Sequence, residues 1–117
     1  MKIISAKVHG VLDYAVVLSF YAAPTLFGFS HTPAVLSYVL ATLHLIVTLC
    51  TAFPLGLFKL LPFPAHGALE AVVSLSFLAM PWVFGFSGDM NARHFYLTLG
   101  IGVLIVIALT DYRGQKA

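Results

Sequence analysis

The chain contains very few charged residues. Asp, Glu, Lys and Arg make up 9% of its 117 residues, whereas 61% are hydrophobic and the mean hydropathy is +1.01. A soluble domain usually carries charge on about a quarter of its residues, so this chain has too few charges to cover a water-facing surface. The composition excludes a soluble globular domain and predicts an integral membrane protein.

Cysteines and the known motifs of enzyme active sites are also scarce. The single cysteine, Cys50, lies in apolar sequence, which excludes an internal disulfide and indicates a buried, unreactive thiol. The chain has no phosphate-binding loop, nucleophile elbow or zinc-protease motif, and no Glu-x-x-His pair of the di-iron bundles. These absences weigh against an enzyme without deciding the question.

Long uncharged stretches separate the few charges. No Asp, Glu, Lys or Arg occurs between Tyr14 and Phe58, from Ala71 to Gly88, or from His94 to Thr110. A helix needs roughly 20 apolar residues to cross a bilayer, and clusters of Gly, Pro, Ser and Asn divide the chain into segments of about that length. We therefore predict an all-α bundle of four transmembrane helices, near residues 8–29, 33–53, 64–86 and 93–111.

The basic residues predict the orientation of this bundle. Four transmembrane helices place most of them on one side of the membrane, namely Lys2, Lys7, Lys59, Arg113 and Lys116, and only Arg93 on the other. Because basic residues are enriched on the cytoplasmic side, both termini and the central loop are predicted to be cytoplasmic. The net charge of +2 is thus a topology signal and not a nucleic-acid-binding surface.

The chain repeats one segment of its own sequence. A shift of 57 residues aligns His9–Ser30 with His66–Ser87 without a gap, and 13 of the 22 positions are identical. This indicates a duplication, with repeat 1 at about 1–62 and repeat 2 at about 63–117 of a single transmembrane domain. Each repeat contributes two helices, so both enter the membrane in the same direction, and a pseudo-twofold axis along the membrane normal is expected.

The second half of each repeat matches more weakly. There Tyr38 aligns with Tyr96 across a one-residue insertion, and the same alignment places Gly102 opposite His44.

The segment "AMPWVFGFS", with a helix before and after it, resembles the SPW-repeat proteins. These are small bacterial and archaeal membrane proteins whose two-helix units carry a Ser-Pro-Trp signature. The corresponding positions here are Met80-Pro81-Trp82 and Ala23-Pro24-Thr25, so neither copy has the serine and one has the tryptophan. The resemblance implies the two-repeat architecture and a bacterial or archaeal cytoplasmic membrane, but it implies no activity and no catalytic residue.

Each repeat opens with a histidine and an acid four residues apart, which places them on one helix face. The pairs are His9 with Asp13 and His66 with Glu70. Ionisable groups inside a membrane span are costly and therefore suggest a function. Three interpretations stay open: structural ion pairs, a metal or haem site with His9 and His66 as ligands, and a proton or ion pathway.

His44 lies in the middle of the second predicted helix. It is interpreted either as a neutral histidine that hydrogen-bonds between helices or as a further ligand or relay. The remaining histidines, His31 and His94, are expected at the outer interface.

Other residues are expected to shape the helices. Pro24 and Pro81 predict kinks that free the carbonyls of Phe20 and Phe77, which the hydroxyls of Ser19 and Ser76 could satisfy. Trp82, Tyr96 and Tyr112 are expected to be interfacial anchors. Gly100 and Gly102 are expected to allow a close approach between helices.

The sequence alone favours a compact membrane scaffold or accessory protein with the lipid bilayer as its environment, in a homo-oligomer or a larger membrane complex and without nucleic acid. The alternative is a cofactor- or ion-binding membrane protein, such as a haem carrier, a carrier of a divalent metal or a proton-coupled transporter. Visible spectra and metal analysis separate these two classes.

Overall fold

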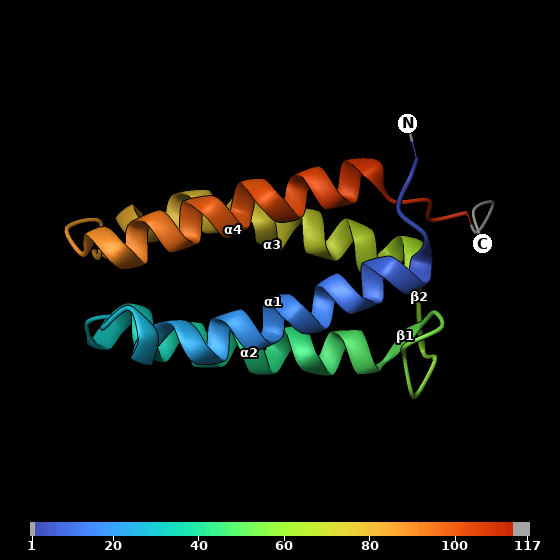
Figure 1. Ribbon diagram of the computed structural model, residues 1–117, viewed down its shortest axis with the longest axis horizontal. Coiled ribbons are helices and arrows are strands. Elements are labelled where there is room, and N and C mark those ends of the chain that lie inside the picture. Colours follow the sequence, from blue (N-terminus) through green and yellow to red (C-terminus); the bar gives the residue numbers. More distant parts are fainter. Residues whose placement is uncertain (1, 114–117) are drawn as a thin grey trace.

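The computed structural model describes residues 2–113, which form four long helices (Figure 1). The predicted all-helical class is confirmed, and each helix begins and ends a few residues earlier than expected. The observed helices are α1 (Ala6–Leu26), α2 (His31–Leu49), α3 (Phe63–Val83) and α4 (Met90–Leu109).

The repeated "FGFS" segment explains where α1 and α3 end. Gly28 and Gly85 adopt φ angles of 60° and 74°, a left-handed conformation that glycine tolerates without steric cost. The next residue then turns back, so that the Phe29 amide donates to the Pro24 carbonyl at 3.0 Å and the Phe86 amide to the Pro81 carbonyl at 2.7 Å. This is the hydrogen bond of a Schellman cap, and it forms once after α1 and once after α3.

Three of the helices, α2, α3 and α4, are long and apolar enough to cross a membrane. The fourth, α1, has 21 residues but includes Lys7, His9 and Asp13 near its beginning. These polar residues lower its hydropathy below that of the other helices. The composition and these three helices together make the chain a membrane protein.

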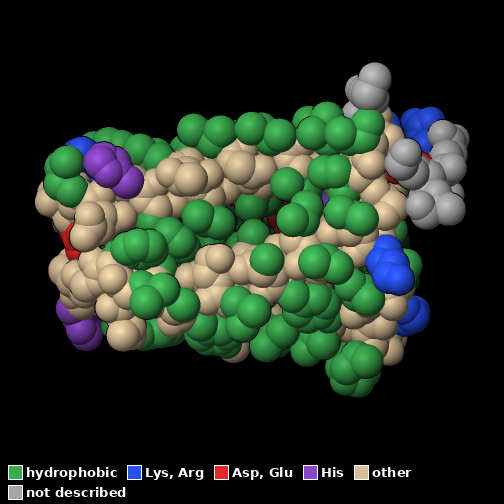
Figure 2. All heavy atoms as spheres, viewed as in Figure 1, with side chains coloured by type: hydrophobic (Ala, Val, Ile, Leu, Met, Phe, Trp, Pro, Cys, Tyr) green, Lys and Arg blue, Asp and Glu red, His purple; other side chains and the backbone are tan. Residues whose placement is uncertain are grey.

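The helices lie in two antiparallel pairs, α1 with α2 and α3 with α4, side by side along the long axis (Figure 1). Short turns close both pairs at one end of the bundle, which we call the turn end. The N-terminus, the end of α4 and the segment between α2 and α3 lie at the other, which we call the terminal end. Hydrophobic side chains cover the length of the face in Figure 2, and most basic side chains visible there lie at the terminal end.

Two very short parallel strand pairings tie the terminal end together. Strand β1 (Thr51–Ala52) pairs with β2 (Leu61–Pro62), with Thr51 opposite Leu61. Ile4 forms a parallel bridge with Thr110. The segments before α1 and α3 are thereby held against the segments after α4 and α2.

The half of the bundle nearer the turn end has an aromatic core. Its buried residues come from all four helices and from the turn between α3 and α4, and are Phe20, Ala41, Phe77, Phe86, Ala92 and Tyr96. The Tyr96 side chain is fully buried and its hydroxyl lies 2.9 Å from Ser37 Oγ. The prediction that Tyr96 is an interfacial anchor is therefore wrong, because its polar end has a partner inside the bundle, whereas Trp82 is 57% exposed.

The two glycines of α4 behave differently. A Cβ added at Gly100 would lie 2.8 Å from Leu78 Cδ2 and 3.0 Å from the Ser74 carbonyl oxygen, whereas one added at Gly102 would meet nothing within 4 Å. Gly100 thus permits the close contact of α4 with α3, and the same prediction for Gly102 is wrong.

Pro24 and Pro81 lie within the last turn of α1 and α3. The Ser19 hydroxyl donates to the Ala15 carbonyl and the Ser76 hydroxyl to the Val73 carbonyl. They do not satisfy the carbonyls that the prolines free, so that expectation is wrong. A kink at either proline stays a prediction.

Candidate metal centre

Five polar side chains meet inside the bundle, in its half nearer the terminal end. They come from three helices: His9 and Asp13 from α1, His44 from α2, and His66 and Glu70 from α3. The side chains of His9 and His66 are 0% and 1% exposed, and those of Asp13 and Glu70 are 4% and 7% exposed. The structure therefore brings together all five residues that the sequence singled out.

All three histidines direct Nε2 toward the two carboxylates. His9 Nε2 lies 2.9 Å from Glu70 Oε1 and 3.3 Å from Asp13 Oδ1. His66 Nε2 lies 3.1 Å from Asp13 Oδ2 and 3.5 Å from Glu70 Oε2. His44 Nε2 lies 3.4 Å from Asp13 Oδ1 and 3.2 Å from Glu70 Oε2. Each histidine thus contacts both acids, so the cluster is one site and not two separate His–acid pairs.

Two threonines orient two of these rings. Thr110 Oγ1 lies 2.8 Å from His9 Nδ1, and Thr51 Oγ1 lies 2.8 Å from His66 Nδ1. Each hydroxyl also donates its one hydrogen to a backbone carbonyl, at Val106 and Val47 respectively. The threonine oxygen must then accept a hydrogen bond from the ring, which places a proton on Nδ1.

This arrangement determines what Nε2 can do. In a neutral imidazole with its proton on Nδ1, Nε2 carries a lone pair. That lone pair would point at carboxylate oxygens, which are also acceptors. The cluster therefore needs either additional protons on its histidines or a cation among its acceptors.

Several atoms of the cluster lack an aligned hydrogen-bond partner. Among the described residues these buried atoms are Asp13 Oδ2, His44 Nε2, His66 Nε2 and Glu70 Oε2. They approach one another within 3.1–3.5 Å without hydrogen-bond geometry. Because buried polar atoms are normally satisfied, these four atoms are the ones that an additional proton or a cation would satisfy.

Aromatic rings cover the cluster at the terminal end. The ring of His9 makes edge contacts with those of Phe63 and Tyr112, at centroid distances of 5.3 and 5.6 Å. The ring of Phe53 lies 5.9 Å from that of His66. Burial raises the pKa of the Tyr112 phenol above its ordinary value of 10, and the nearby carboxylates of the cluster add to the effect. Tyr112 was predicted to be an interfacial anchor; it is half-buried and lies over the site.

The glycine after each repeated histidine makes room for these covers. A Cβ at Gly10 would lie 2.9 Å from both Phe53 Cε2 and Leu55 Cδ1, and one at Gly67 would lie 2.5 Å from Tyr112 Cε1. The His-Gly dipeptide thus has a physical reason: the histidine enters the cluster while the glycine lets an aromatic or leucine side chain close over it.

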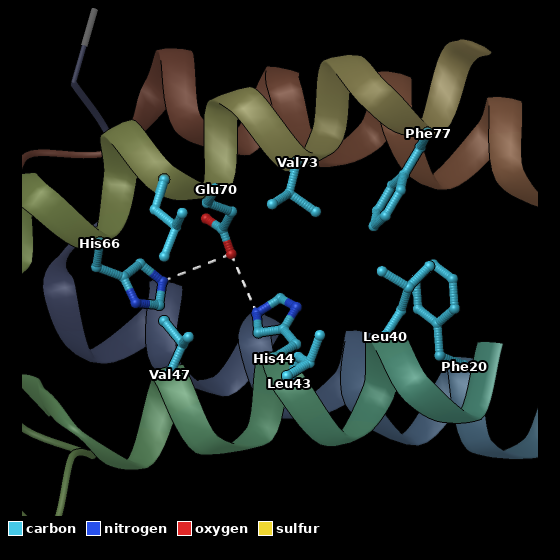
Figure 3. Close-up of a pocket in the computed structure, with 10 residues that line it drawn as sticks. Phe20, Leu40, Leu43, His44, Val47, His66, Glu70, Val73 and Phe77 are labelled. Atoms are coloured by element: carbon cyan, nitrogen blue, oxygen red, sulfur yellow. Dashed lines mark ion pairs between the residues drawn. The ribbon is translucent and has the colours of Figure 1, made fainter. Parts of the chain in front are cut away.

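A pocket of about 240 Å³ opens beside the cluster, between α2 and α3. His44, His66 and Glu70 lie at one end of it and Phe20 and Phe77 at the other (Figure 3). The His44 side chain, 16% exposed, is the most accessible member of the cluster. It has no threonine partner among the described residues, in contrast to His9 and His66.

Sequence reasoning missed both threonines and misjudged the counterpart of His44. Thr51 and Thr110 follow the ends of α2 and α4 and are 59 residues apart. The same offset relates the buried positions of the two helices, Pro33 with Ala92 and Ser37 with Tyr96. The offset of 58 residues that aligns Tyr38 with Tyr96 pairs a 41% exposed residue with a fully buried one, whereas an offset of 59 pairs residues of like burial and places Val103 opposite His44. A search for a common offset among the polar residues of the two helices could have found the threonines.

The two remaining histidines, His31 and His94, lie at the beginnings of α2 and α4, at the turn end. Both are exposed. They do not join the cluster, and their position at the outer membrane interface stays a prediction.

No family model matches the chain, and no curated protein or solved structure matches it either. Its similarity to the SPW-repeat proteins therefore stays a prediction.

Proposed function

We propose that this protein is a four-span membrane protein that binds one divalent transition-metal ion in the cluster of His9, Asp13, His44, His66 and Glu70. The observation that carries the proposal is the convergence of three Nε2 atoms and two carboxylates, with Nδ1 of two rings already engaged. One ligand atom from each of His9, Asp13, His66 and Glu70 can be chosen so that all four lie within 4.8 Å of one another.

The distances fit a metal ion. Ligand atoms held at 2.0–2.2 Å from a metal are about 2.8–3.6 Å apart when they are neighbours in an octahedral or tetrahedral arrangement. The nitrogen–oxygen separations in the cluster are 2.9–3.5 Å. Small side-chain shifts would therefore suffice to bind an ion.

The hydrogen bonds to threonine support the same function. Metal-bound histidines usually donate their second ring N–H to an oxygen, which orients the ring and leaves the other nitrogen free for the metal. Thr51 and Thr110 supply such oxygens to His66 and His9. Two carboxylates and a divalent cation also cancel in charge, so the buried site would be neutral.

The donor set indicates the class of metal. Three imidazoles with two carboxylates suit Zn²⁺, Mn²⁺, Fe²⁺ or Co²⁺ better than Ca²⁺ or Mg²⁺, which prefer oxygen alone. Haem fits poorly, because the carboxylate oxygens of Asp13 and Glu70 occupy the space beside both His9 Nε2 and His66 Nε2 where a porphyrin would lie.

The other interpretations have less support. A proton or ion pathway would need polar groups on both sides of the cluster, whereas the half of the bundle nearer the turn end is packed with the aromatic core. The scaffold interpretation needs only ion pairs within the cluster, and the experiment below separates it from a metal site.

We also propose that the two helix pairs are repeats of a duplicated hairpin related by a pseudo-twofold axis. The support comes from contacts that occur twice. Thr51 with His66 matches Thr110 with His9, and the strand pair Thr51–Leu61 matches the bridge Thr110–Ile4. In this proposal the terminal end is cytoplasmic, in a bacterial or archaeal cytoplasmic membrane, as expected for an SPW-repeat protein.

Metal analysis of the purified protein tests the function. The protein, carrying a tag without histidine, is loaded with Zn²⁺ or Mn²⁺ in mild detergent, desalted and analysed for bound metal. We expect one ion per chain, loss of that ion in the double variant His9→Ala/His66→Ala, and retention in the control His31→Ala/His94→Ala. Equal metal content in the wild-type protein and the His9→Ala/His66→Ala variant would contradict the proposal and favour the scaffold.

A further inference from the structure

The pocket between α2 and α3 has two chemically different ends. One end holds the acceptor oxygens of Glu70 and the imidazoles of His44 and His66, and the other holds the rings of Phe20 and Phe77 (Figure 3). The other side chains that line the pocket are apolar: Leu40, Leu43, Val47, Leu69 and Val73. Such a lining fits a molecule with one polar head and an apolar body.

At the polar end of the pocket, one carboxylate oxygen of Glu70 lacks a hydrogen-bond donor with good geometry in the described part of the chain. Glu70 Oε2 is buried and has no aligned hydrogen-bond partner among the described residues, and an ionised carboxylate can only accept. An entering hydroxyl group could donate to this oxygen. The oxygen of the same hydroxyl could accept from the imidazole of His44, which is the ring most exposed toward the pocket.

The size of the pocket and the aromatic side chains at its far end indicate a ligand with a single ring. A cavity of about 150 Å³ in another protein holds benzene, so the 240 Å³ of this pocket accommodates a ring with a short substituent. The rings of Phe20 and Phe77, with centroids 5.2 Å apart, offer aromatic faces and edges to such a ring.

The route into the pocket runs through the lipid. Its mouth lies between α2 and α3, both long and apolar enough to cross a membrane, and Leu43 and Leu69 there are 55% and 43% exposed. A molecule that enters from this side must dissolve in the bilayer and must be uncharged.

We propose that this pocket binds the hydroxylated ring of a lipid-soluble phenol or quinol, with the hydroxyl on Glu70 and His44. The proposal goes beyond metal binding and does not depend on it, because Glu70 and His44 themselves line the pocket.

Three matched compounds test the proposal on the wild-type protein in nanodiscs, with empty nanodiscs as the correction for partitioning. These are 4-butylphenol, butylbenzene, which lacks the hydroxyl, and 1-octanol, which lacks the ring. Binding is measured by ligand-observed saturation-transfer NMR and by the shift in melting temperature. We expect 4-butylphenol to bind ~10-fold or more tightly than either other compound, a difference of about 1.4 kcal/mol. Equal binding of butylbenzene or 1-octanol would overturn the proposal.

A pair of neighbouring valines locates the site. Val73 lines the pocket, whereas Val72 is 66% exposed on the outside of the same helix. Val73→Trp should fill the pocket and lower 4-butylphenol affinity ~10-fold or more, and Val72→Trp should leave it unchanged. Unchanged binding in Val73→Trp would contradict the assignment. Metal content measured on the same samples separates this outcome from failure of the metal site, and the comparison of compounds decides even if Val73→Trp does not fold.

Discussion

Two threonine hydroxyls set the orientation of the His9 and His66 rings. Each threonine hydroxyl gives its hydrogen to a carbonyl one turn earlier, at Val47 or Val106, and its oxygen is thereby left to accept from a histidine Nδ1. The rings of His9 and His66 are thus held with Nε2 toward the carboxylates. The third ring, that of His44, lacks such a partner among the described residues and is the best candidate for a ligand that exchanges.

Replacing the threonines tests this role. Thr51→Val and Thr110→Val keep the side-chain shape and remove the acceptor, so each should lower metal affinity ~10- to 100-fold and alter the visible spectrum of a bound Co²⁺ ion. Thr48→Val is the matched control, because Thr48 is also buried but its hydroxyl has no partner among the described residues. Wild-type Co²⁺ spectra and affinities in both valine variants would exclude the role.

The sequence predicts four of the five cluster residues from local patterns. A spacing of four places His9 with Asp13 and His66 with Glu70, and the duplication relates the two pairs. Whether His44 and the two threonines reach the His–acid pairs depends on how α2 and α4 are rotated about their axes. Weak hydrophobic patterning leaves that rotation undetermined, because a membrane helix is apolar on all sides.

Gly100 allows α4 to pack closely against α3. Gly100→Ala should destabilise the protein by about 1–3 kcal/mol, because the new Cβ would overlap Leu78 and approach the Ser74 carbonyl. Gly102→Ala, two residues away with open space around it, should change stability by less than about 0.5 kcal/mol or increase it slightly. Thermal unfolding in detergent measures both variants. Equal losses would contradict the packing described for α4.

A carboxylate joins the two helix pairs at the turn end. Asp89 precedes α4 and accepts from the Ala92 amide, and its Oδ2 lies 2.8 Å from both the amide and the hydroxyl of Ser30. Burial alone would raise the pKa of Asp89, but these hydrogen bonds outweigh it and lower the pKa below the ordinary 3.8. A lowered folded-state pKa means that the stabilisation is present above pH 3.8 and is lost as the pH falls through the folded-state value.

The pH dependence of a variant tests this contact. Wild-type protein should be more stable than Asp89→Asn by about 0.3–1 kcal/mol at neutral pH, because asparagine caps a helix as well as aspartate does but lacks the negative charge that a helix N-terminus favours. The difference should shrink as the pH is lowered from 5 toward 3, near and below the ordinary pKa of 3.8. Chemical unfolding of both proteins across this range provides the measurement, and a difference independent of pH would contradict it.

At the level of elements, the sequence predicts the number and approximate extent of the helices because uncharged stretches and turn clusters are local features. The ends of α1 and α3 come a few residues early because Gly28 and Gly85 cap these helices before the turn residues that follow. Tyr96 illustrates the limit of such reasoning. A tyrosine near a helix end is typical of an interfacial anchor, and only the packing of all four helices reveals its partner, Ser37.

At the scale of the whole molecule, the proposed topology makes a direct prediction. Reporter domains fused after Ala117 and at Lys59 should both be cytoplasmic, and one at Asp89 should lie on the opposite side, because most basic residues belong to the terminal end. A reporter after Ala117 on the outer side would contradict this topology.

Side chains from α1, α2 and α3 give the molecule one buried polar cluster that joins the two helix pairs. Such a cluster binds the two helix pairs to each other, since His9 of α1 contacts Glu70 of α3 at 2.9 Å. A metal ion there would link the helix pairs more strongly than the ion pairs alone. We therefore expect the five side chains of the cluster to surround a single metal ion.

X-ray absorption spectroscopy of the metal-loaded, detergent-purified protein tests whether the five side chains share one ion. We expect a Zn²⁺ or Mn²⁺ site with imidazole scattering and nitrogen or oxygen ligands at about 2.0–2.2 Å, without sulfur. The imidazole contribution should fall in His44→Ala and disappear in His9→Ala/His44→Ala/His66→Ala. A spectrum of fully hydrated metal, or one that does not change in the triple variant, would contradict it.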